Sequence, residues 1–220
     1  MATPEAAEIR LDRRESMHAI RALRLQRGDH ILVFDGTGHE WECEVLETGT
    51  LLRARILEHR NMRREPSRRI TMAVAVPKGW RLDYMVEKIA ELGAARLVPL
   101  RFARSVARVE GPKLERLRRV ATAASKQCGR ATVLEIVPEE RLAQFQPCGE
   151  MLMGRAESDE TILDVSLGSE VTMVIGPEGG FTTEEEEALR NRGARSVRLG
   201  PSILRIETAA LAALSFLALR

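Results

Sequence analysis

The chain has 220 residues, of which 44% are hydrophobic and 30% are charged, and its formal net charge is +2 at pH 7. This composition is typical of a folded soluble protein and excludes a disordered chain. The three cysteines, Cys43, Cys128 and Cys148, form no C-x-x-C pair, so neither a disulfide framework nor a zinc knuckle is predicted. The amino terminus has no apolar signal segment, and the longest apolar run, 208–219, is too short to span a bilayer. We therefore expect a cytoplasmic protein without a membrane segment.

Positive charge is concentrated in the middle of the chain. Residues 71–150 carry 14 Lys and Arg against 9 Asp and Glu, whereas residues 151–220 carry 7 against 11. Thirty of the 34 basic residues are arginine, whose planar guanidinium binds phosphate bidentately and stacks on bases. RNA is a reasonable partner on these grounds, and a solvated basic face is the alternative interpretation.

Residues 1–69 have the pattern of a small β-rich domain. The sequence predicts a short helix or turn over 18–25 and strands over 30–34, 40–46 and 50–58, with Asp35-Gly36-Thr37-Gly38 as a hairpin turn. Short strands joined by tight turns favour a small barrel. The polar stretch 61–69, interrupted by Pro66, is the expected linker. Arginines cluster near the start of this domain, and those we expect to contact RNA are Arg13, Arg21 and Arg24.

From residue 70 the pattern changes to strands that alternate with helices. Strands are predicted over 70–76, 96–100, 133–137, 151–153, 171–175 and 196–199. Helices are predicted over 81–92, 113–128 and 206–219, and another begins at Thr182 with a capping box to Glu185 and ends before Gly193. Such alternation indicates an α/β domain over 70–220, with a largely parallel sheet and helices on both faces.

Glycine and proline follow two of these strands. Gly176-Pro177-Glu178-Gly179-Gly180 follows strand 171–175, and Gly200-Pro201 follows strand 196–199, so we expect the two loops to leave adjacent strands. Ligands of open α/β sheets bind outside the carboxyl ends of the strands, which favours a site here, although the first string alone is more often just a turn. Neither loop matches a P-loop or G-x-G-x-x-G pattern, which disfavours a P-loop kinase or an ordinary dinucleotide-binding enzyme.

Arg104 and the four histidines are the remaining candidates for functional residues. Arg104 lies in the loop after strand 96–100, where it is either a phosphate contact or a surface arginine without a role. The histidines stand at no metal-ligand spacing and accompany no nucleophile motif, so neither a metal centre nor a catalytic triad is predicted. These histidines are His18, His30, His39 and His59.

Five motifs stand in order along the chain: PKGWRLDYMVEKIAELG (77–93), ARSV (103–106), SKQCGR (125–130), IGPEGGF (175–181) and LGPSILRIETAALAAL (199–214). Together they resemble the ribosomal RNA small subunit methyltransferase E family, the bacterial 16S rRNA (uracil-N3)-methyltransferases. The stretch 23–38 is similar to the amino-terminal PUA-like barrel of that family. The resemblance covers essentially the whole chain.

The resemblance implies a PUA-like barrel over 1–69 and a SPOUT domain over 70–220 that is tied into a trefoil knot. It also implies S-adenosyl-L-methionine as cofactor, no metal, a homodimer, and methylation of N3 of one uridine in the decoding region, on 16S rRNA or on the small ribosomal subunit. The final helix, apolar nearly all round, would then serve both core and subunit interface. The cofactor-binding residues carried over from the family are Leu152, Met153, Gly154, Ile175, Gly176, Gly179, Gly180, Leu199, Gly200, Ile203 and Leu204. Further RNA contacts are expected from Lys78, Arg81, Arg104 and Arg130.

The chemistry of uridine suggests roles for three charged residues. Uridine N3 carries a proton and is a poor nucleophile until that proton leaves. We expect Arg205 to stabilise the negative charge that spreads to the uracil oxygens. Glu207 or Glu178 would accept the proton or orient Arg205, and Glu207 has the alternative role of a carboxylate favoured by the helix dipole.

Four residues depart from the family pattern: Trp80, Lys126, Ser202 and Ile206. These departures concern substrate contacts more than the cofactor site. Two other functions stay open. One is another SPOUT RNA methyltransferase, acting on a ribose 2′-OH or a tRNA base, and the other is a non-catalytic RNA-binding factor in ribosome assembly.

Overall fold

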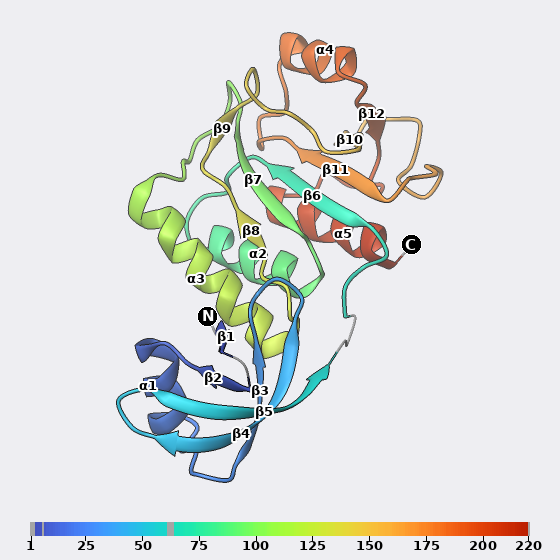
Figure 1. The fold of residues 1–220 in the computed structure, drawn as a ribbon. Helices are drawn as coiled ribbons and strands as arrows, with labels where there is room; N and C mark the ends of the chain where they lie inside the picture. Colours follow the sequence, from blue (N-terminus) through green and yellow to red (C-terminus); the bar gives the residue numbers. More distant parts are fainter. Residues whose placement is uncertain (1–2, 6, 61–63, 220) are drawn as a thin grey trace. The chain divides into compact units, whose positions relative to one another are not determined.

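The structure is a computed structural model that describes residues 3–5, 7–60 and 64–219. The chain forms two compact units, each with its own hydrophobic core (Figure 1). Unit 1 comprises residues 1–64 with 129–132, and unit 2 comprises 65–128 with 133–220. Part of the expected linker, 61–63, lies outside the described residues. In the described part of the chain, no helix is long and apolar enough to cross a membrane.

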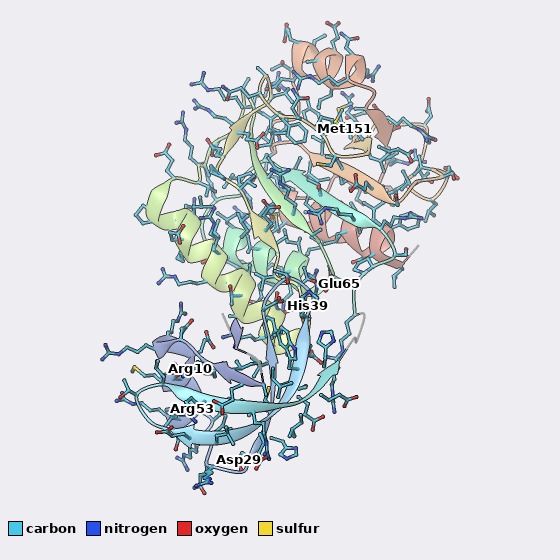
Figure 2. The ribbon with its side chains drawn as sticks, viewed as in Figure 1. Arg10, Asp29, His39, Arg53, Glu65 and Met151 are labelled. Carbon is cyan, nitrogen blue, oxygen red and sulfur yellow. The ribbon has the colours of Figure 1, made fainter. Side chains whose placement is uncertain are left out.

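Unit 1 is built on a five-stranded antiparallel sheet in the order β1-β2-β5-β4-β3. Its strands are β1 (Thr3–Glu5), β2 (Glu8–Arg10), β3 (His30–Phe34), β4 (Glu40–Thr48) and β5 (Leu52–Arg60). The three predicted strands are confirmed as β3, β4 and β5, while β1 and β2 were not predicted. On the sheet, the Arg53 guanidinium bridges Glu8 and Glu47, with N–O distances of 3.5 Å to each. Figure 2 labels Arg53 on this sheet.

The helix of unit 1 begins earlier than the sequence predicted. Helix α1 (Arg13–Arg21) covers the first part of the helix or turn that was predicted over 18–25, but it begins before residue 18, so the predicted start was wrong. Its start is fixed by Asp12, whose carboxylate accepts a hydrogen bond from the backbone N–H of Glu15 at 2.9 Å, and this bond also lowers the pKa of Asp12. Its end is set before Arg24, whose φ of 55° is left-handed and incompatible with a continuing helix.

The Asp35 carboxylate organises the predicted hairpin turn between β3 and β4. It accepts hydrogen bonds from the Thr37 backbone N–H at 2.7 Å and from the Thr37 hydroxyl at 2.6 Å. Burial alone would raise the pKa of Asp35, but these bonds and one from the His39 backbone N–H lower it below its ordinary value. The hairpin is confirmed by the antiparallel pairing of the two strands.

Unit 2 contains a seven-stranded sheet whose described pairs are all parallel, which confirms the predicted sheet type. The order is β12-β10-β11-β6-β7-β8, and β9 pairs with β7. The strands are β6 (Arg69–Val74), β7 (Arg96–Arg101), β8 (Glu135–Ile136), β9 (Glu140–Arg141), β10 (Glu150–Gly154), β11 (Glu170–Ile175) and β12 (Arg195–Val197).

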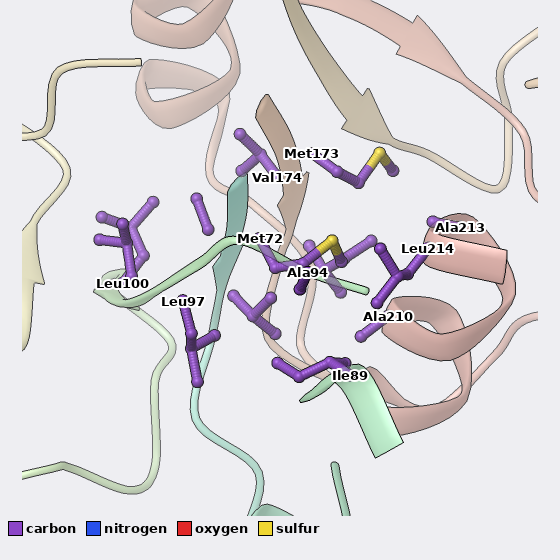
Figure 3. Packing of buried hydrophobic residues seen from close by; sticks show 14 of the residues in the cluster. Met72, Ile89, Ala94, Leu97, Leu100, Met173, Val174, Ala210, Ala213 and Leu214 are labelled. Carbon is purple, nitrogen blue, oxygen red and sulfur yellow. The ribbon is translucent and has the colours of Figure 1, made fainter. Parts of the chain in front are cut away.

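The helices of unit 2 are α2 (Trp80–Glu91), α3 (Gly111–Cys128), α4 (Thr183–Asn191) and α5 (Ile206–Leu219). Helix α5 packs on α2 and against β6 and β11. Figure 3 shows part of this core, where the small side chains of Ala210 and Ala213 gather with Leu214, Met72 and Ile89. Small residues on α5 allow the helix to approach its neighbours closely.

The strand order corrects one expectation. Strands β11 and β12 are not adjacent, because β10 lies between them and pairs with both. Parallel strands end at the same edge of a sheet, so the exit loops of β10, β11 and β12 gather there.

Candidate functional site

A cavity of about 430 Å³ lies where β10, β11 and β12 end. This volume is within the range of about 300–1,000 Å³ that is usual for small-molecule sites. Most of its lining comes from the three exit loops, within 154–157, 175–181 and 199–206. Arg104, Glu186 and Ala209 contribute from neighbouring segments.

The loop after β11 is shaped by its glycines and by Phe181. A Cβ atom on Gly176 would lie 2.7 Å from Cζ of Phe181, so the ring leaves no room for a side chain there. Gly180 has a φ of +72°, and its N–H donates to the Pro177 carbonyl oxygen at 2.9 Å, which closes a tight turn. Behind the loop, Phe181 meets Phe102 edge to face, with ring centroids 5.2 Å apart. The loop is therefore closely packed.

The loop after β7 clamps this glycine loop. The Arg104 guanidinium donates to the carbonyl oxygens of Gly179 at 2.6 Å and Phe181 at 3.2 Å. The Ala103 backbone N–H donates to Oε1 of Glu185 at 2.6 Å. The other carboxylate oxygen of Glu185 accepts the Thr182 N–H at 2.9 Å, which confirms the predicted capping box. Arg104 thus holds the cavity wall, and its contact with RNA stays a prediction.

The loop after β10 forms a further wall, of which the sequence analysis had named Gly154 but not Arg155 and Glu157. The Arg155 backbone N–H donates to the Val197 carbonyl oxygen at 2.9 Å, which joins this loop to β12. The Arg155 side chain forms ion pairs with Glu186 of α4 and with Glu157. Sequence reasoning missed these residues because the loop lacks a Gly-Pro signal and the Arg155–Glu186 pair is distant in sequence. A prediction that β10 lies between β11 and β12 would have pointed to them.

Acidic and basic groups share the cavity. Arg104 and Arg155 contribute positive charge, and Glu157, Glu178 and Glu186 contribute negative charge. At the start of α4, hydrogen bonds from the backbone of Glu184 and from the Thr182 hydroxyl lower the pKa of Glu184. A ligand that carries both charge signs fits such a lining.

Of the eleven residues predicted to bind a cofactor, nine line the cavity. Leu152 and Met153 do not, because both are fully buried within β10 and serve the sheet core. The nine are Gly154, Ile175, Gly176, Gly179, Gly180, Leu199, Gly200, Ile203 and Leu204.

The three predicted catalytic residues lie in different surroundings. Glu178 is exposed and lines the cavity, whereas Arg205 is exposed but is not among the lining residues. Glu207, in the first turn of α5, is only 8% exposed and its Oε1 lies 3.9 Å from Nε of Arg81. Its Oε2 has no hydrogen-bond partner among the described residues. The structure therefore brings Glu207 to Arg81 and leaves Glu178 at the cavity.

The predicted RNA contacts also differ in exposure. Arg13, Arg21 and Arg24 are exposed on or just after α1 in unit 1, and Lys78 is exposed before α2 in unit 2. Arg130 is only 3% exposed. Contact of Arg130 with RNA stays a prediction. Among the described residues, no cluster of three or more His, Cys, Asp or Glu could hold a metal ion.

The family models and the curated relatives that match this chain agree with one another. Residues 63–218 match the family model of an RNA methyltransferase domain, and residues 11–56 match that of an RNA methyltransferase PUA domain. The ribosomal RNA small subunit methyltransferase E of Mycobacterium tuberculosis is 33% identical over 221 residues, which cover 93% of this chain and 83% of the relative.

Two solved structures share the fold over nearly the whole chain. One is a ribosomal RNA small subunit methyltransferase E from Neisseria gonorrhoeae bound to S-adenosyl methionine, with a TM-score of 0.88, 26% identity, and coverage of 96% of this chain and 92% of that one. The other is a putative methyltransferase from Legionella pneumophila in complex with the same cofactor, with a TM-score of 0.85, 28% identity, and coverage of 98% and 93%. With the cavity at the carboxyl ends of its parallel strands, the chain belongs to the RNA methyltransferase family.

Proposed function

We propose that this protein transfers a methyl group from S-adenosyl-L-methionine to N3 of a specific uridine in 16S rRNA of the small ribosomal subunit. The observation that carries the proposal is the cavity formed by three strand-exit loops in a member of the RNA methyltransferase family. Similarity to the small subunit methyltransferases E, one of them bound to this cofactor, supports both donor and substrate. The proposed setting is the cytoplasm.

The residues around the cavity fit this cofactor. Ile175, Leu199 and Leu204 supply apolar walls for an adenine ring, and the glycine loop supplies backbone N–H and C=O groups for its edge. The acidic and basic side chains of the lining match a ligand with an amino group, a carboxylate and a sulfonium. When bound, S-adenosyl-L-methionine supplies a methyl group that its sulfonium already activates.

The chain's own residues have to position the uracil and remove its N3 proton. Holding N3 in line with the methyl donor converts the transfer into an effectively intramolecular step. We propose that Glu178 accepts the proton, because it is the predicted carboxylate that lines the cavity. Arg205 would stabilise the charge left on the uracil oxygens. Glu207, buried beside Arg81, would act by fixing the first turn of α5.

The proposed organisation follows that of the family. Residues 1–69 would form a PUA-like barrel that binds RNA, and residues 70–220 a SPOUT domain in which the segment 199–205 belongs to a trefoil knot. The protein would act as a homodimer. Leu211 and Phe216 on α5 are half-buried within one chain, and a second copy would cover the rest of their apolar surface.

The test is incubation with 30S particles and methyl-labelled cofactor, followed by mass spectrometry of the nucleosides. The proposal predicts label in N3-methyluridine. Label on a ribose 2′-oxygen or in a tRNA base would assign a different methyltransferase activity. Cofactor binding without transfer to any RNA would favour a non-catalytic RNA-binding factor.

A further inference from the structure

Two aromatic side chains stand exposed at the start of α2. Trp80 is 73% exposed and Tyr84 is 41% exposed. The two residues are four apart on one helix face, and their rings meet edge to face with centroids 6.0 Å apart. In this T-shaped pair, the ring of Tyr84 supports the indole of Trp80 while most of the indole surface is left to solvent.

Basic groups flank the pair. Lys78 is exposed, and the Nε of Arg81 donates to the Lys78 carbonyl oxygen at 3.4 Å, which ties the two residues together. The nearby carboxylates are engaged by cations, because Asp83 accepts a hydrogen bond from Arg116 at 2.6 Å and Glu207 lies beside Arg81. The surface around the indole therefore suits a polyanion with π faces.

A short route connects this pair to the cavity. Trp80 and Arg81 open α2, and Arg81 contacts Glu207 in the first turn of α5. Ile206 and Ala209 of that same turn line the cavity. The Arg81–Glu207 contact therefore joins the start of α2 to the turn of α5 that borders the cavity.

We propose that Trp80, supported by Tyr84, stacks on an unpaired base of the RNA substrate beside the target nucleotide, while Lys78 and Arg81 bind the flanking phosphates. Single-stranded RNA is commonly recognised by stacking of its bases on aromatic side chains. This inference rests on the proposed function, because it takes the ligand of the cavity region to be RNA.

The chain's tryptophan content allows a direct test. Only Trp41 and Trp80 are present, so the Trp41→Phe variant leaves Trp80 as the sole tryptophan. Titration of this variant with a short single-stranded RNA is expected to quench its fluorescence to saturation, and the same sequence as a duplex is expected to quench it much less. Fluorescence that does not respond to single-stranded RNA would overturn the proposal.

Substitutions of Trp80 then measure its contribution to affinity. Trp80→Ala is expected to raise the Kd for single-stranded RNA about tenfold, whereas Trp80→Phe, which keeps a ring, retains most of the affinity. Leu163→Ala, at another exposed apolar residue of unit 2, is the matched control and is expected to bind RNA as the wild type does. Affinity for S-adenosyl-L-methionine is expected to stay unchanged in all three variants.

Two results would contradict the stacking role. One is wild-type RNA affinity in Trp80→Ala. The other is a loss of RNA binding in Trp80→Ala that is accompanied by a change of molar mass in light scattering, which would make this surface a subunit contact. A failure of the proposed function is distinguishable, because the Trp41→Phe variant would then bind RNA with quenching of Trp80, while the wild type would transfer no methyl group to that RNA.

Discussion

The guanidinium of Arg104 lies 2.6 Å from the carbonyl oxygen of Gly179, a residue 75 positions further along the chain. This hydrogen bond joins the loop after β7 to the glycine loop after β11. Gly179 and Gly180 line the cavity. Arg104, which lies outside the three exit loops, therefore holds part of the cavity wall in place.

Arg104→Ala is expected to weaken the binding of S-adenosyl-L-methionine about tenfold, because a charged hydrogen bond that orders the glycine loop is lost. Arg104→Lys should fall in between, since the shorter lysine keeps the positive charge but does not reach both carbonyl oxygens that Nη1 of Arg104 contacts. Calorimetric titration measures both. Arg108→Ala, an exposed arginine of the same loop that pairs with Glu110, is the control and should bind normally. Unchanged cofactor affinity with weakened RNA binding would instead make Arg104 the phosphate contact that the sequence suggested.

Gly176→Ala is expected to lower the free energy of unfolding by about 1–3 kcal/mol, because the added methyl group meets the ring of Phe181. Gly200→Ala is its matched control, since a Cβ atom at Gly200 has nothing within 4 Å. Denaturant unfolding of the two variants measures the difference. Equal stability would show that the ring of Phe181 moves aside without cost and that the loop is less tightly packed than its contacts indicate.

Local signals predicted the parts of the site that depend on neighbours in sequence. The capping box of Thr182 and Glu185 and the turn at Gly176–Gly180 involve residues a few positions apart, so the pattern alone identified them. The position of β10 between β11 and β12 depends on pairing across the sheet, which no local pattern encodes. The Arg155–Glu186 pair was missed for that reason.

The same distinction explains the unexpected burial of Arg130, whereas the misplaced start of α1 has a local cause. Arg130 carries a charge and stands in a basic stretch, which favours an exposed position, yet its burial depends on tertiary packing. The start of α1 was misplaced because the cap at Asp12 was overlooked, although the spacing of Asp12 and Glu15 was visible in the sequence.

Arg205→Ala is expected to lower kcat for methyl transfer about 100-fold or more while the Kd for the cofactor stays unchanged. The reason is that Arg205 would stabilise charge that develops on the uracil oxygens only during the reaction. Arg205→Lys should recover part of the rate, because it keeps the charge. Single-turnover kinetics with saturating cofactor separates the two effects, and an unchanged rate in Arg205→Ala would remove the residue from the mechanism.

Asp35→Asn is expected to destabilise unit 1 in a pH-dependent manner. The hydrogen bonds from Thr37 and His39 hold the pKa of Asp35 below its ordinary value. The ionised Asp35 therefore stabilises the folded state fully above the unfolded-state pKa of about 3.9. This stabilisation is lost as the pH falls through the lower pKa of the folded state. Thermal unfolding at neutral and acidic pH should show a deficit of about 1 kcal/mol at neutral pH that shrinks in acid. A deficit that does not depend on pH would show that the charge of Asp35 is unimportant to the turn.

Titration of S-adenosyl-L-methionine into two variants of Gly200 tests most directly whether the cavity between the three exit loops holds the methyl donor. Gly200 lines the cavity and has open space around its Cβ position, so Gly200→Trp fills the cavity without disturbing the core, and Gly200→Ala leaves it open. If the cavity holds the cofactor, the wild type and Gly200→Ala bind one cofactor per chain, and Gly200→Trp, folded to the same melting temperature, binds none. Undiminished binding by Gly200→Trp would place the cofactor elsewhere and contradict the account.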